Sequence, residues 1–391
     1  MLPFITSFRL QRSKQVTVQS KLDLVIVTLT LAVGGAEKHV VRIATSAKRS
    51  GRKVAVLKLV PGGALSTDLL TAGIEQIELN KDGVLGWIYA LAGFVKFLRA
   101  RKPQVVYSVL SVPNIFCGAT SWVFSRTRFV WGIRSSKLIN ESHSLKVFLV
   151  HQLEKHFSRY SDKIIFNSKS GLEYFRAQGF STARGSVVLN GVDTTQICYK
   201  DAGRVRVREN LGLPIAADLV GTLGRADHTK GSDTFLKVAC LLLPRNASTY
   251  FIAIGRNWSE LIERNAEAVH WRKMGRIIEL SENHYVADHL SALDIFLLSS
   301  RHEGTPNALL EAMSCERPCI VTQAGDATAV VGNPDLVANG SRLEDLVDRI
   351  EWVLSLDSKR RVALGQELRK RVLNRFSFES EFENLSKELF D

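Results

Sequence analysis

Two glutamates near the end of the chain are candidates for binding a phosphorylated ligand. The segment R-H-E-G-T-P-N-A-L-L-E places Glu303 in a loop after an apolar run, and Glu311 follows seven intervening residues later in a helix expected to begin near Pro306. A helix start offers free backbone N–H groups and the positive end of the helix dipole to a phosphate. A carboxylate inside the helix can accept two hydroxyl hydrogens, which suits a ribose diol. Solvated acids near a helix start are the alternative.

A second candidate loop follows the apolar run that opens the second half of the chain. Its sequence, G-T-L-G-R-A-D-H-T-K-G, places Gly221 and Gly224 where backbone must approach a ligand, with Arg225 and Lys230 around the same loop. Two fixed cations suit a diphosphate leaving group, whose negative charge grows as its bond to a sugar breaks. Surface cations without a function are the alternative. Because both loops are expected at one edge of the same sheet, we expect the cations and the glutamates to form one site.

A third candidate lies near the beginning of the chain. The segment L-T-L-A-V-G-G-A-E-K-H-V leads from a strand through Gly34 and Gly35 into a helix. Glycines permit close approach of backbone, and a helix start again favours a phosphate or an acceptor. The glycine pair alone is a weak signal, because many strand-to-helix turns contain one for packing.

A repeated alternation of strands and helices is expected to position these loops. Apolar, β-branched runs separated by helix-length segments predict parallel strands at residues 23–29, 53–60, 74–79, 104–110, 129–133, 163–168 and 186–190, then 218–224, 248–255, 276–280, 294–300 and 318–323. The segment Asn190–Asp193 breaks the pattern between the two series. We therefore predict an α/β protein with two Rossmann-like, doubly wound parallel-sheet domains that face a cleft.

Length and composition agree with two domains and an intracellular location. A chain of 391 residues exceeds what one hydrophobic core normally organises. Its five cysteines form no C-x-x-C pair, which favours a reducing compartment and a cytoplasmic location. The basic cluster near the N-terminus follows a very short apolar run, the reverse of a secretory signal, and no stretch of about 18 uninterrupted apolar residues follows. We expect neither export nor a membrane span.

The charge of the chain is concentrated in its first half. Lys and Arg exceed Asp and Glu by 16 in residues 1–195, whereas Asp and Glu are in excess by 3 in residues 196–391. An anionic membrane surface, a phosphorylated lipid or nucleic acid would complement this field. No nucleic-acid motif accompanies the charge, so we expect no nucleic-acid partner. The apolar segment 83–103 fits either a helix that covers the sheet, which we favour, or a membrane-surface helix.

Together these motifs, in this order over nearly the whole chain, resemble the family-4 retaining glycosyltransferases of GT-B fold. The resemblance implies an N-terminal acceptor-binding domain at residues 1–195, a C-terminal donor-binding domain at residues 196–375, and a final helix at 376–391 that packs back on the first domain. It implies catalytic roles for Glu303, Arg225 and Lys230. Donor contacts are implied for Glu311, Gly304, Thr305, Pro306, Asn307, Ala308, Leu309, Gly224, Gly34 and Gly35.

The resemblance also implies a mechanism without a protein nucleophile. The departing diphosphate would help to deprotonate the acceptor on the same face of the sugar, so that the anomeric configuration is retained. Glu303 would orient sugar hydroxyls, while Arg225 and Lys230 would stabilise the leaving group. The chain contains no Asp-x-Asp, the usual ligand pair of the single-domain GT-A class, so we expect no cofactor and no metal.

Some positions depart from the family's pattern. Relatives often carry a histidine after the strand at 104–110, where this chain has S-V-P-N, so Ser111 and Asn114 become candidates for contact with acceptor or sugar. Arg134, in F-V-W-G-I-R-S-S-K, is a further candidate for acceptor or phosphate. The segment S-E-N-H at 281–284 replaces a glycine turn that relatives place near the nucleotide base, so the base stays open.

The function that best fits these features is transfer of a sugar from a nucleotide-diphosphate sugar to a glycan or lipid-linked acceptor, in the biosynthesis of a surface polysaccharide. The basic first half suggests peripheral association with the inner face of the cytoplasmic membrane. Two alternatives remain: a sugar-nucleotide epimerase of similar architecture, which needs no acceptor, and a basic scaffold protein without activity. The sequence does not identify the sugar, the base, the acceptor, the linkage or the oligomeric state.

Overall fold

The computed structural model describes residues 21–32, 34–79, 83–134, 145–214, 216–281, 285–340 and 342–391. Its described residues form two compact units. The first unit comprises the residues up to Val106 together with Val123–Arg128, and the second comprises Tyr107–Trp122 and Phe129–Asp391. The predicted boundaries at 195 and 375 stay a prediction.

The first half of the chain builds a seven-stranded sheet with the order β3-β2-β1-β4-β5-β6-β7. The pairs β1–β2, β2–β3, β5–β6 and β6–β7 are parallel. The strands are β1 (Leu24–Thr28), β2 (Val54–Lys58), β3 (Glu75–Glu78), β4 (Val105–Val109), β5 (Arg128–Ile133), β6 (Lys163–Phe166) and β7 (Gly185–Val187). Every residue of β1, β2 and β4 is buried. Such continuously apolar strands are what a parallel sheet covered on both faces requires.

The second half builds a six-stranded sheet with the order β10-β9-β8-β11-β12-β13, in which the chain steps outward in both directions from β8 and β11. The strands are β8 (Asp218–Leu223), β9 (Thr249–Ile254), β10 (Ile277–Leu280), β11 (Ile295–Leu298), β12 (Cys319–Thr322) and β13 (Val337–Ala338). Their side chains form one continuous hydrophobic core with the surrounding helices. The adjacency of β8 and β11 brings the loops that follow them to one edge of the sheet.

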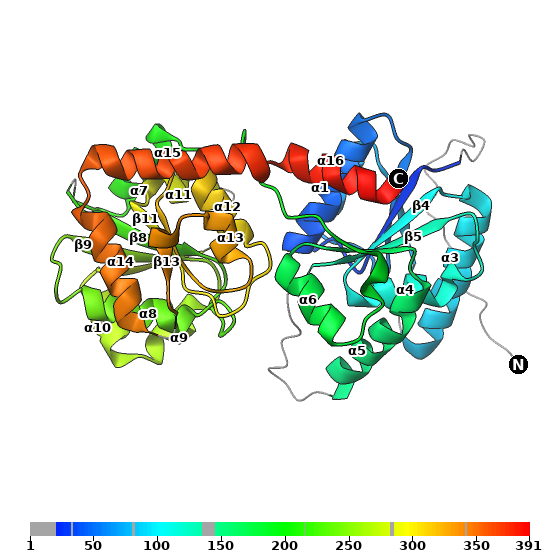
Figure 1. Cartoon of the computed structure of the whole chain (residues 1–391), viewed down its shortest axis with the longest axis horizontal. Helices are drawn as coiled ribbons and strands as arrows, with labels where there is room; N and C mark the ends of the chain where they lie inside the picture. The colour runs from blue at the N-terminus through cyan, green and yellow to red at the C-terminus, as the bar shows by residue number, and fades with distance from the viewer. Residues whose placement is uncertain are drawn as a thin grey trace, which may run out of the picture. The chain divides into compact units, whose positions relative to one another are not determined.

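Helices connect the strands throughout both series (Figure 1). In the first half they are α1 (Gly35–Arg49), α2 (Ser66–Thr71), α3 (Gly83–Arg101), α4 (Ser111–Ser121), α5 (Leu145–Phe157) and α6 (Lys169–Ala177). In the second half they are α7 (Asp201–Asn210), α8 (Ser232–Leu242), α9 (Trp258–Glu263), α10 (Ala266–Lys273), α11 (Val286–Ala292), α12 (Asn307–Ser314), α13 (Ala327–Val331), α14 (Leu343–Ser355), α15 (Ser358–Arg375) and α16 (Phe378–Phe390). Short 3-10 helices lie at Ser158–Tyr160, Thr182–Arg184 and Pro334–Leu336. None of the helices in the described part is both long and apolar enough to cross a membrane.

The segment that joins the two strand series pairs with the segment that joins the last two helices. Val192 N donates to the carbonyl of Phe376 at 2.9 Å, and Phe378 N donates to the carbonyl of Val192 at 2.9 Å. Gly191 N donates to Glu381 of α16 at 2.9 Å. Figure 1 shows α16 on one side of β5–β7 and α4–α6 on the other. Helix α16 buries Leu385 and Leu389.

The two-domain α/β fold and the predicted strands are confirmed; the two-residue strand β13 was not predicted. The predicted helix at 83–103 has one buried side and one exposed side. Ala90, Phe94 and Leu98 of α3 are buried, which confirms the expected covering helix, whereas Ile88 and Tyr89 are exposed.

A buried polar network fixes α5 against α4. The Glu154 side chain is only 2% exposed. It accepts a hydrogen bond from Asn114 Nδ2 at 3.0 Å, and Asn114 Oδ1 accepts one from Ser108 Oγ at 2.8 Å. Burial raises the pKa of Glu154 above its ordinary value, although its hydrogen bonds to Asn114 and Ser111 act in the opposite direction. The folded chain therefore favours the protonated form of this carboxyl more than the unfolded chain does.

This shift predicts a pH-dependent effect of Glu154→Gln. A raised folded-state pKa stabilises the fold fully below the unfolded-state pKa, and that contribution is lost as pH rises through the folded-state value. The amide keeps an oxygen acceptor but has no charge to bury. We therefore expect the unfolding free energy of the variant, relative to the parent chain, to increase from about pH 5 to about pH 8. Urea denaturation across this range measures it, with the exposed Glu173→Gln as the charge control; a constant or opposite difference contradicts the network.

Candidate functional site

The strongest predicted site residues meet at the carboxyl ends of β8 and β11. Lys230 Nζ lies 2.8 Å from Glu303 Oε1, and Ser300 Oγ donates to the same oxygen at 2.7 Å. The Glu303 side chain is 7% exposed, while that of Lys230 is 38% exposed. The carboxylate of Glu303 is thus buried and bonded to protein groups, whereas the ammonium group of Lys230 keeps contact with solvent. Because an ammonium has three donors, Lys230 can bond Glu303 and still offer hydrogens to a ligand.

Asp227 organises the loop that carries the two predicted cations. It accepts hydrogen bonds from Arg225 Nε at 2.6 Å and from the backbone N–H of Lys230 at 2.8 Å. Burial raises the pKa of Asp227, but Arg225 and Lys230 outweigh burial, and the pKa lies below its ordinary value. The side chain of Arg225 is 60% exposed. Asp227 is therefore a further residue of this loop that was not predicted from the sequence.

Two glycines allow the backbone of the site to pack closely. A Cβ on Gly231 would lie 1.9 Å from the carbonyl oxygen of Ser299, and one on Gly325 would lie 1.8 Å from that of Glu303. Both glycines have left-handed φ angles of +60° and +53° respectively. Larger residues at either position would push the Glu303 loop away from the sheet edge.

Helix α12 begins where the sequence predicts and leaves its first turn without a side-chain cap. Pro306 occupies the N-cap position and makes no capping hydrogen bond. The backbone N–H groups at the start of the helix thus keep the character of an anion site. Glu311 lies in the second turn of the same helix and is half-buried. Leu309 is buried and fixes the helix on the core.

Within the second unit, the side chains beside the Glu303 loop have protein partners. Thr305 Oγ1 donates to the carbonyl of Asn167 at 2.5 Å. Asn190 Nδ2 donates to the carbonyl of Thr305 and to Asn307 Oδ1, each at 2.9 Å. A Cβ on Gly304 would lie 3.2–3.3 Å from atoms of Asn167 and Ser168. These contacts engage the Thr305 hydroxyl hydrogen and the Asn307 amide oxygen, and backbone N–H groups at the start of α12 are natural donors to a phosphate.

The remaining residues predicted to contact the donor are three glycines and one alanine. Gly34 is the N-cap of α1 with an extended φ of −161°, and Gly35 is the first residue of that helix. Both belong to the first unit, so their contact with a donor stays a prediction. Gly224 has a φ of +143°, and a Cβ there would meet open space. Ala308 is half-buried in the first turn of α12.

The candidates for acceptor contact lie mostly in structural networks. Asn114 is fully buried and bonded on both sides of its amide, so its placement argues against contact with an acceptor. Ser111, the first residue of α4, is half-buried and bonds Glu154. Arg134 NH2 donates to Asn190 Oδ1 at 2.6 Å and lies 3.7 Å from Glu381. Ser135, Lys137 and residues 282–284 lie outside the described residues.

The ion pair of Arg301 with Asp233, beside the site, was also not predicted from the sequence. Arg301 donates from both terminal nitrogens to the carboxylate of Asp233, at 2.6 and 2.8 Å. This pairing lowers the pKa of Asp233 to about 2, against the opposing effect of burial. The backbone N–H of Arg301 donates to Thr229 at 2.8 Å. The pair therefore ties the end of β11 to the Lys230 loop. In the described part of the chain, no group of three His, Cys, Asp or Glu side chains could hold a metal ion.

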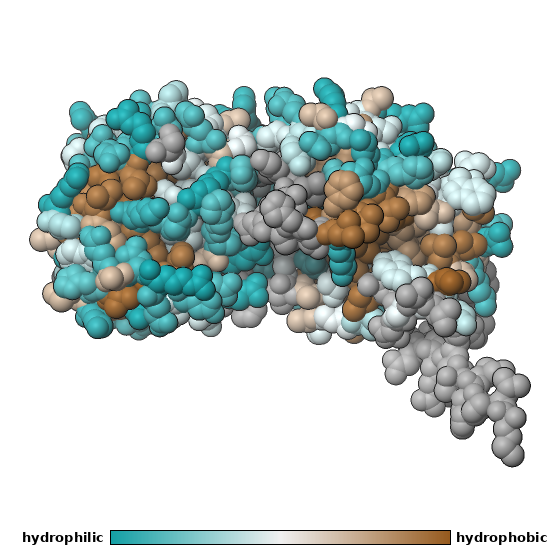
Figure 2. Space-filling model, turned by 90° about the horizontal axis from the view of Figure 1, so that it is seen from below, coloured by the Kyte–Doolittle hydropathy of each residue, from teal (hydrophilic) through white to brown (hydrophobic). Residues whose placement is uncertain are grey.

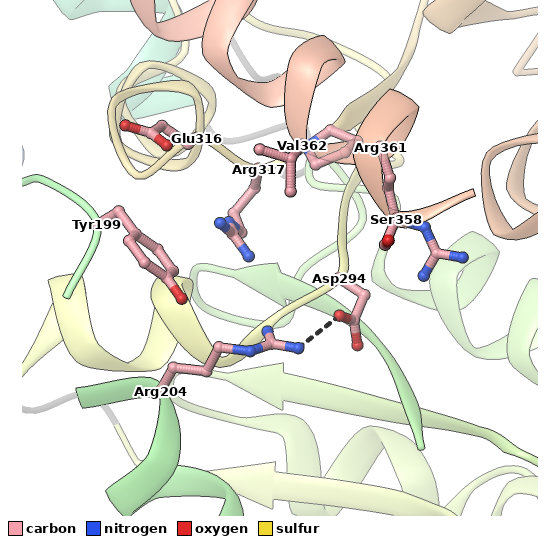
Figure 3. A pocket seen from close by; sticks show the side chains of 9 residues that line it. Tyr199, Arg204, Asp294, Glu316, Arg317, Ser358, Arg361 and Val362 are labelled. Carbon is pink, nitrogen blue, oxygen red and sulfur yellow. Dashed lines mark hydrogen bonds and ion pairs between the residues drawn. The ribbon is translucent and has the colours of Figure 1, made fainter. Parts of the chain in front are cut away.

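A separate cavity of about 340 Å³ lies at the amino ends of β11 and β12, the opposite edge of the sheet from Glu303 (Figure 3). Arg204 and Arg317 line it, and both donate to carbonyls at the end of α11. Arg204 also bonds Asp294 at 2.7 Å, and the guanidinium of Arg317 stacks 4.8 Å from the ring centre of Tyr199. These contacts satisfy the carboxyl end of a helix, so the cluster has a structural explanation.

Comparisons with known proteins identify the family of this chain. Residues 33–196 match the family described as Glycosyltransferase Family 4, and residues 206–371 match Glycosyl transferases group 1. The chain is 31% identical over 179 residues to the lipopolysaccharide core biosynthesis mannosyltransferase LpsB of Rhizobium meliloti, covering 44% of this chain and 48% of that protein. The chain thus spans about half the length of this relative.

Longer matches share the architecture at lower identity. An N,N'-diacetylbacillosaminyl-diphospho-undecaprenol alpha-1,3-N-acetylgalactosaminyltransferase of Campylobacter jejuni is 25% identical over 345 residues, 82% of this chain and 87% of that protein. The crystal structure of Anabaena HepE in complex with UDP superposes with a TM-score of 0.81 at 17% identity, covering 94% of this chain and 99% of that one. This structure supports the GT-B fold. The chain belongs to the family-4, group 1 glycosyltransferases, with the family-4 match in its first half and the group 1 match in its second.

Proposed function

We propose that this protein transfers a sugar from a nucleotide-diphosphate sugar to a glycan or lipid-linked acceptor, with retention of the anomeric configuration. The observation that carries the proposal is the cluster of Lys230, Glu303 and Ser300 at the carboxyl ends of two adjacent strands, next to the uncapped start of α12. A cation, a desolvated carboxylate and free backbone N–H groups are the parts that binding a diphosphate and a sugar requires. The name of LpsB supports a surface polysaccharide as the product class, and that of the Campylobacter jejuni enzyme supports a lipid-linked acceptor.

Each residue has a defined task in this reaction. The bond between the anomeric carbon and the diphosphate oxygen breaks while the acceptor oxygen forms a bond on the same face, and the acceptor proton passes to the departing diphosphate. Arg225 and Lys230 stabilise the negative charge that grows on the diphosphate. Glu303 orients sugar hydroxyls, and Glu311 accepts the ribose hydroxyls. Backbone N–H groups of residues 304–309 hold the phosphates.

The proposal includes no metal, because the two cations and the helix start take the place of a bridging ion. Activity that survives removal of divalent cations by EDTA supports this part, whereas activity restored only by added Mg²⁺ or Mn²⁺ contradicts it. The proposal also includes a cytoplasmic location. All five cysteines are unpaired, as a reducing compartment would keep them.

Ligand-dependent thermal stability tests the donor site and identifies the base. A panel of UDP, GDP, ADP and their sugar conjugates is compared for the parent chain and for Glu311→Ala. A ligand at about 100 times its dissociation constant adds about 2.7 kcal/mol of stability. We expect one nucleotide to raise the melting temperature of the parent chain, and the shift to shrink in the variant. Glu351→Ala, which changes a half-buried glutamate of α14, is the matched control. Equal shifts in the parent chain and Glu311→Ala contradict the assignment of Glu311.

A further inference from the structure

Helix α5 presents its large apolar side chains to solvent. Leu145, Phe148, Leu149 and Leu153 are 70%, 56%, 51% and 47% exposed. Their spacing of three or four residues places them on one stripe of the helix. Figure 2, seen from the side on which Figure 1 places α5, shows apolar surface gathered over this part of the molecule. Contiguous apolar surface of this kind marks an interaction site more often than single exposed apolar residues do.

The inward face of the same helix buries two polar side chains alongside the partly buried Val147, Val150 and Phe157. His151 and Glu154 are 6% and 2% exposed, and Glu154 belongs to the network with Asn114. An ordinary surface helix turns its large apolar side chains toward the core, whereas α5 turns four of them outward. The network fixes α5 in this orientation, so rotation of the helix would break buried hydrogen bonds. The outward apolar stripe is thus held in place by α4, and the fold itself leaves it uncovered in the described residues.

The charge around this stripe indicates what covers it. Residues 83–160 contain 11 Lys and Arg against 2 Asp and Glu. On and just after α5 lie Lys146, Lys155 and Arg159, and the acid on this helix, Glu154, is buried. An apolar stripe flanked by basic side chains complements a bilayer with anionic headgroups, because the acyl boundary accepts the apolar groups and the headgroups attract the cations. A second copy of this basic surface would repel it.

We propose that α5 is a membrane-binding helix that lies in the headgroup plane of an anionic lipid bilayer. Leu145, Phe148, Leu149 and Leu153 enter the acyl boundary, while Lys146 and Lys155 contact anionic headgroups. This inference deepens the proposed function, since a surface-bound enzyme meets a lipid-linked acceptor in the plane of the membrane. It does not depend on the identity of the donor.

Sedimentation of the full chain with lipid vesicles tests the inference. We expect the parent chain to bind vesicles that contain phosphatidylglycerol about tenfold or more tightly than vesicles of phosphatidylcholine alone, and the difference to shrink as salt rises from about 50 mM to about 500 mM. The double variant Phe148→Asp/Leu149→Asp is expected to weaken binding to anionic vesicles by about tenfold or more. The double variant Lys146→Glu/Lys155→Glu is expected to remove mainly the salt-dependent part of the binding to anionic vesicles.

Matched controls separate this result from misfolding and from failure of the donor site. Met274→Asp and Val362→Asp change side chains that are 62% and 53% exposed in the second half of the chain, and both should bind vesicles as the parent chain does. The nucleotide-dependent thermal shift should persist in Phe148→Asp/Leu149→Asp, which shows that the fold and the donor site are intact. Unchanged vesicle binding by this double variant overturns the inference. So does a lipid-independent dimer of the parent chain that the double variant turns into monomer.

Discussion

Replacement of Lys230 by alanine is expected to lower kcat/KM for the nucleotide-sugar donor by about 10²–10³-fold. Lys230 Nζ lies 2.8 Å from Glu303 Oε1, at the edge of the sheet where the loops after β8 and β11 meet. The variant removes the cation that we propose to face the growing charge of the diphosphate. It also leaves the buried carboxylate of Glu303 without its ion pair, so the sugar-orienting group is perturbed at the same time.

Steady-state kinetics with the donor identified by the thermal-shift panel measure this loss. Lys237→Ala is the matched control, because Lys237 is a largely exposed lysine of α8 that lies 3.5 Å from Asp233. The control should change kcat/KM less than about twofold, as exposed ion pairs contribute little. Lys230→Arg keeps the charge with a different geometry and should recover part of the loss. A Lys230→Ala variant as active as the control would rule out a role for Lys230 in the reaction.

Asp294→Ala is expected to lower the unfolding free energy by about 3–5 kcal/mol, the largest effect on stability that we predict. The Asp294 side chain is 12% exposed and bonds Arg204 at 2.7 Å and Arg208 at 3.2 Å. It also accepts the backbone N–H of Leu219, the second residue of β8, at 2.8 Å. Removal of the carboxylate leaves two half-buried guanidinium groups without their counter-ion and a strand-end N–H without an acceptor.

Thermal unfolding of the parent chain and of two variants measures this effect. Glu263→Ala is the control, since the Glu263 side chain is 64% exposed and lies 3.7 Å from Arg272. It should change the unfolding free energy by less than about 0.5 kcal/mol. Nucleotide binding below the melting temperature should persist in Asp294→Ala, because Asp294 lies at the opposite end of β11 from Glu303. A loss below about 1 kcal/mol would contradict the structural role of this ion cluster.

The fold could be predicted because parallel strands buried on both faces are continuous apolar runs. Residues such as Leu24–Thr28 and Ile295–Leu298 show this pattern and form β1 and β11. Proline also marked a boundary correctly, since Pro306 precedes the first residue of α12. The strand Val337–Ala338 has only two residues, too few to show any periodicity.

The site could be predicted in part, because topology brings strand ends together without knowledge of side-chain partners. That reasoning predicted that Lys230 and Glu303 would meet, and the structure places them in contact. It missed the partnership of Arg301 with Asp233, which depends on rotamers and on the path of a loop. It also gave no sign of the partner of Asn114, because Glu154 lies 40 residues further along the chain. A polar residue after a strand is ambiguous until its partners are known.

Transfer of a sugar from a nucleotide sugar is the central claim, and product analysis tests it most directly. The purified chain is incubated with the nucleotide sugar chosen by the binding panel, with and without a lipid-linked acceptor fraction, and products are identified by mass spectrometry and NMR. We predict equal amounts of free nucleoside diphosphate and glycosylated acceptor, formed only when acceptor is present, with the anomeric configuration of the donor retained. Conversion of the donor to an isomer without acceptor, or bound donor that is never consumed, would contradict the claim.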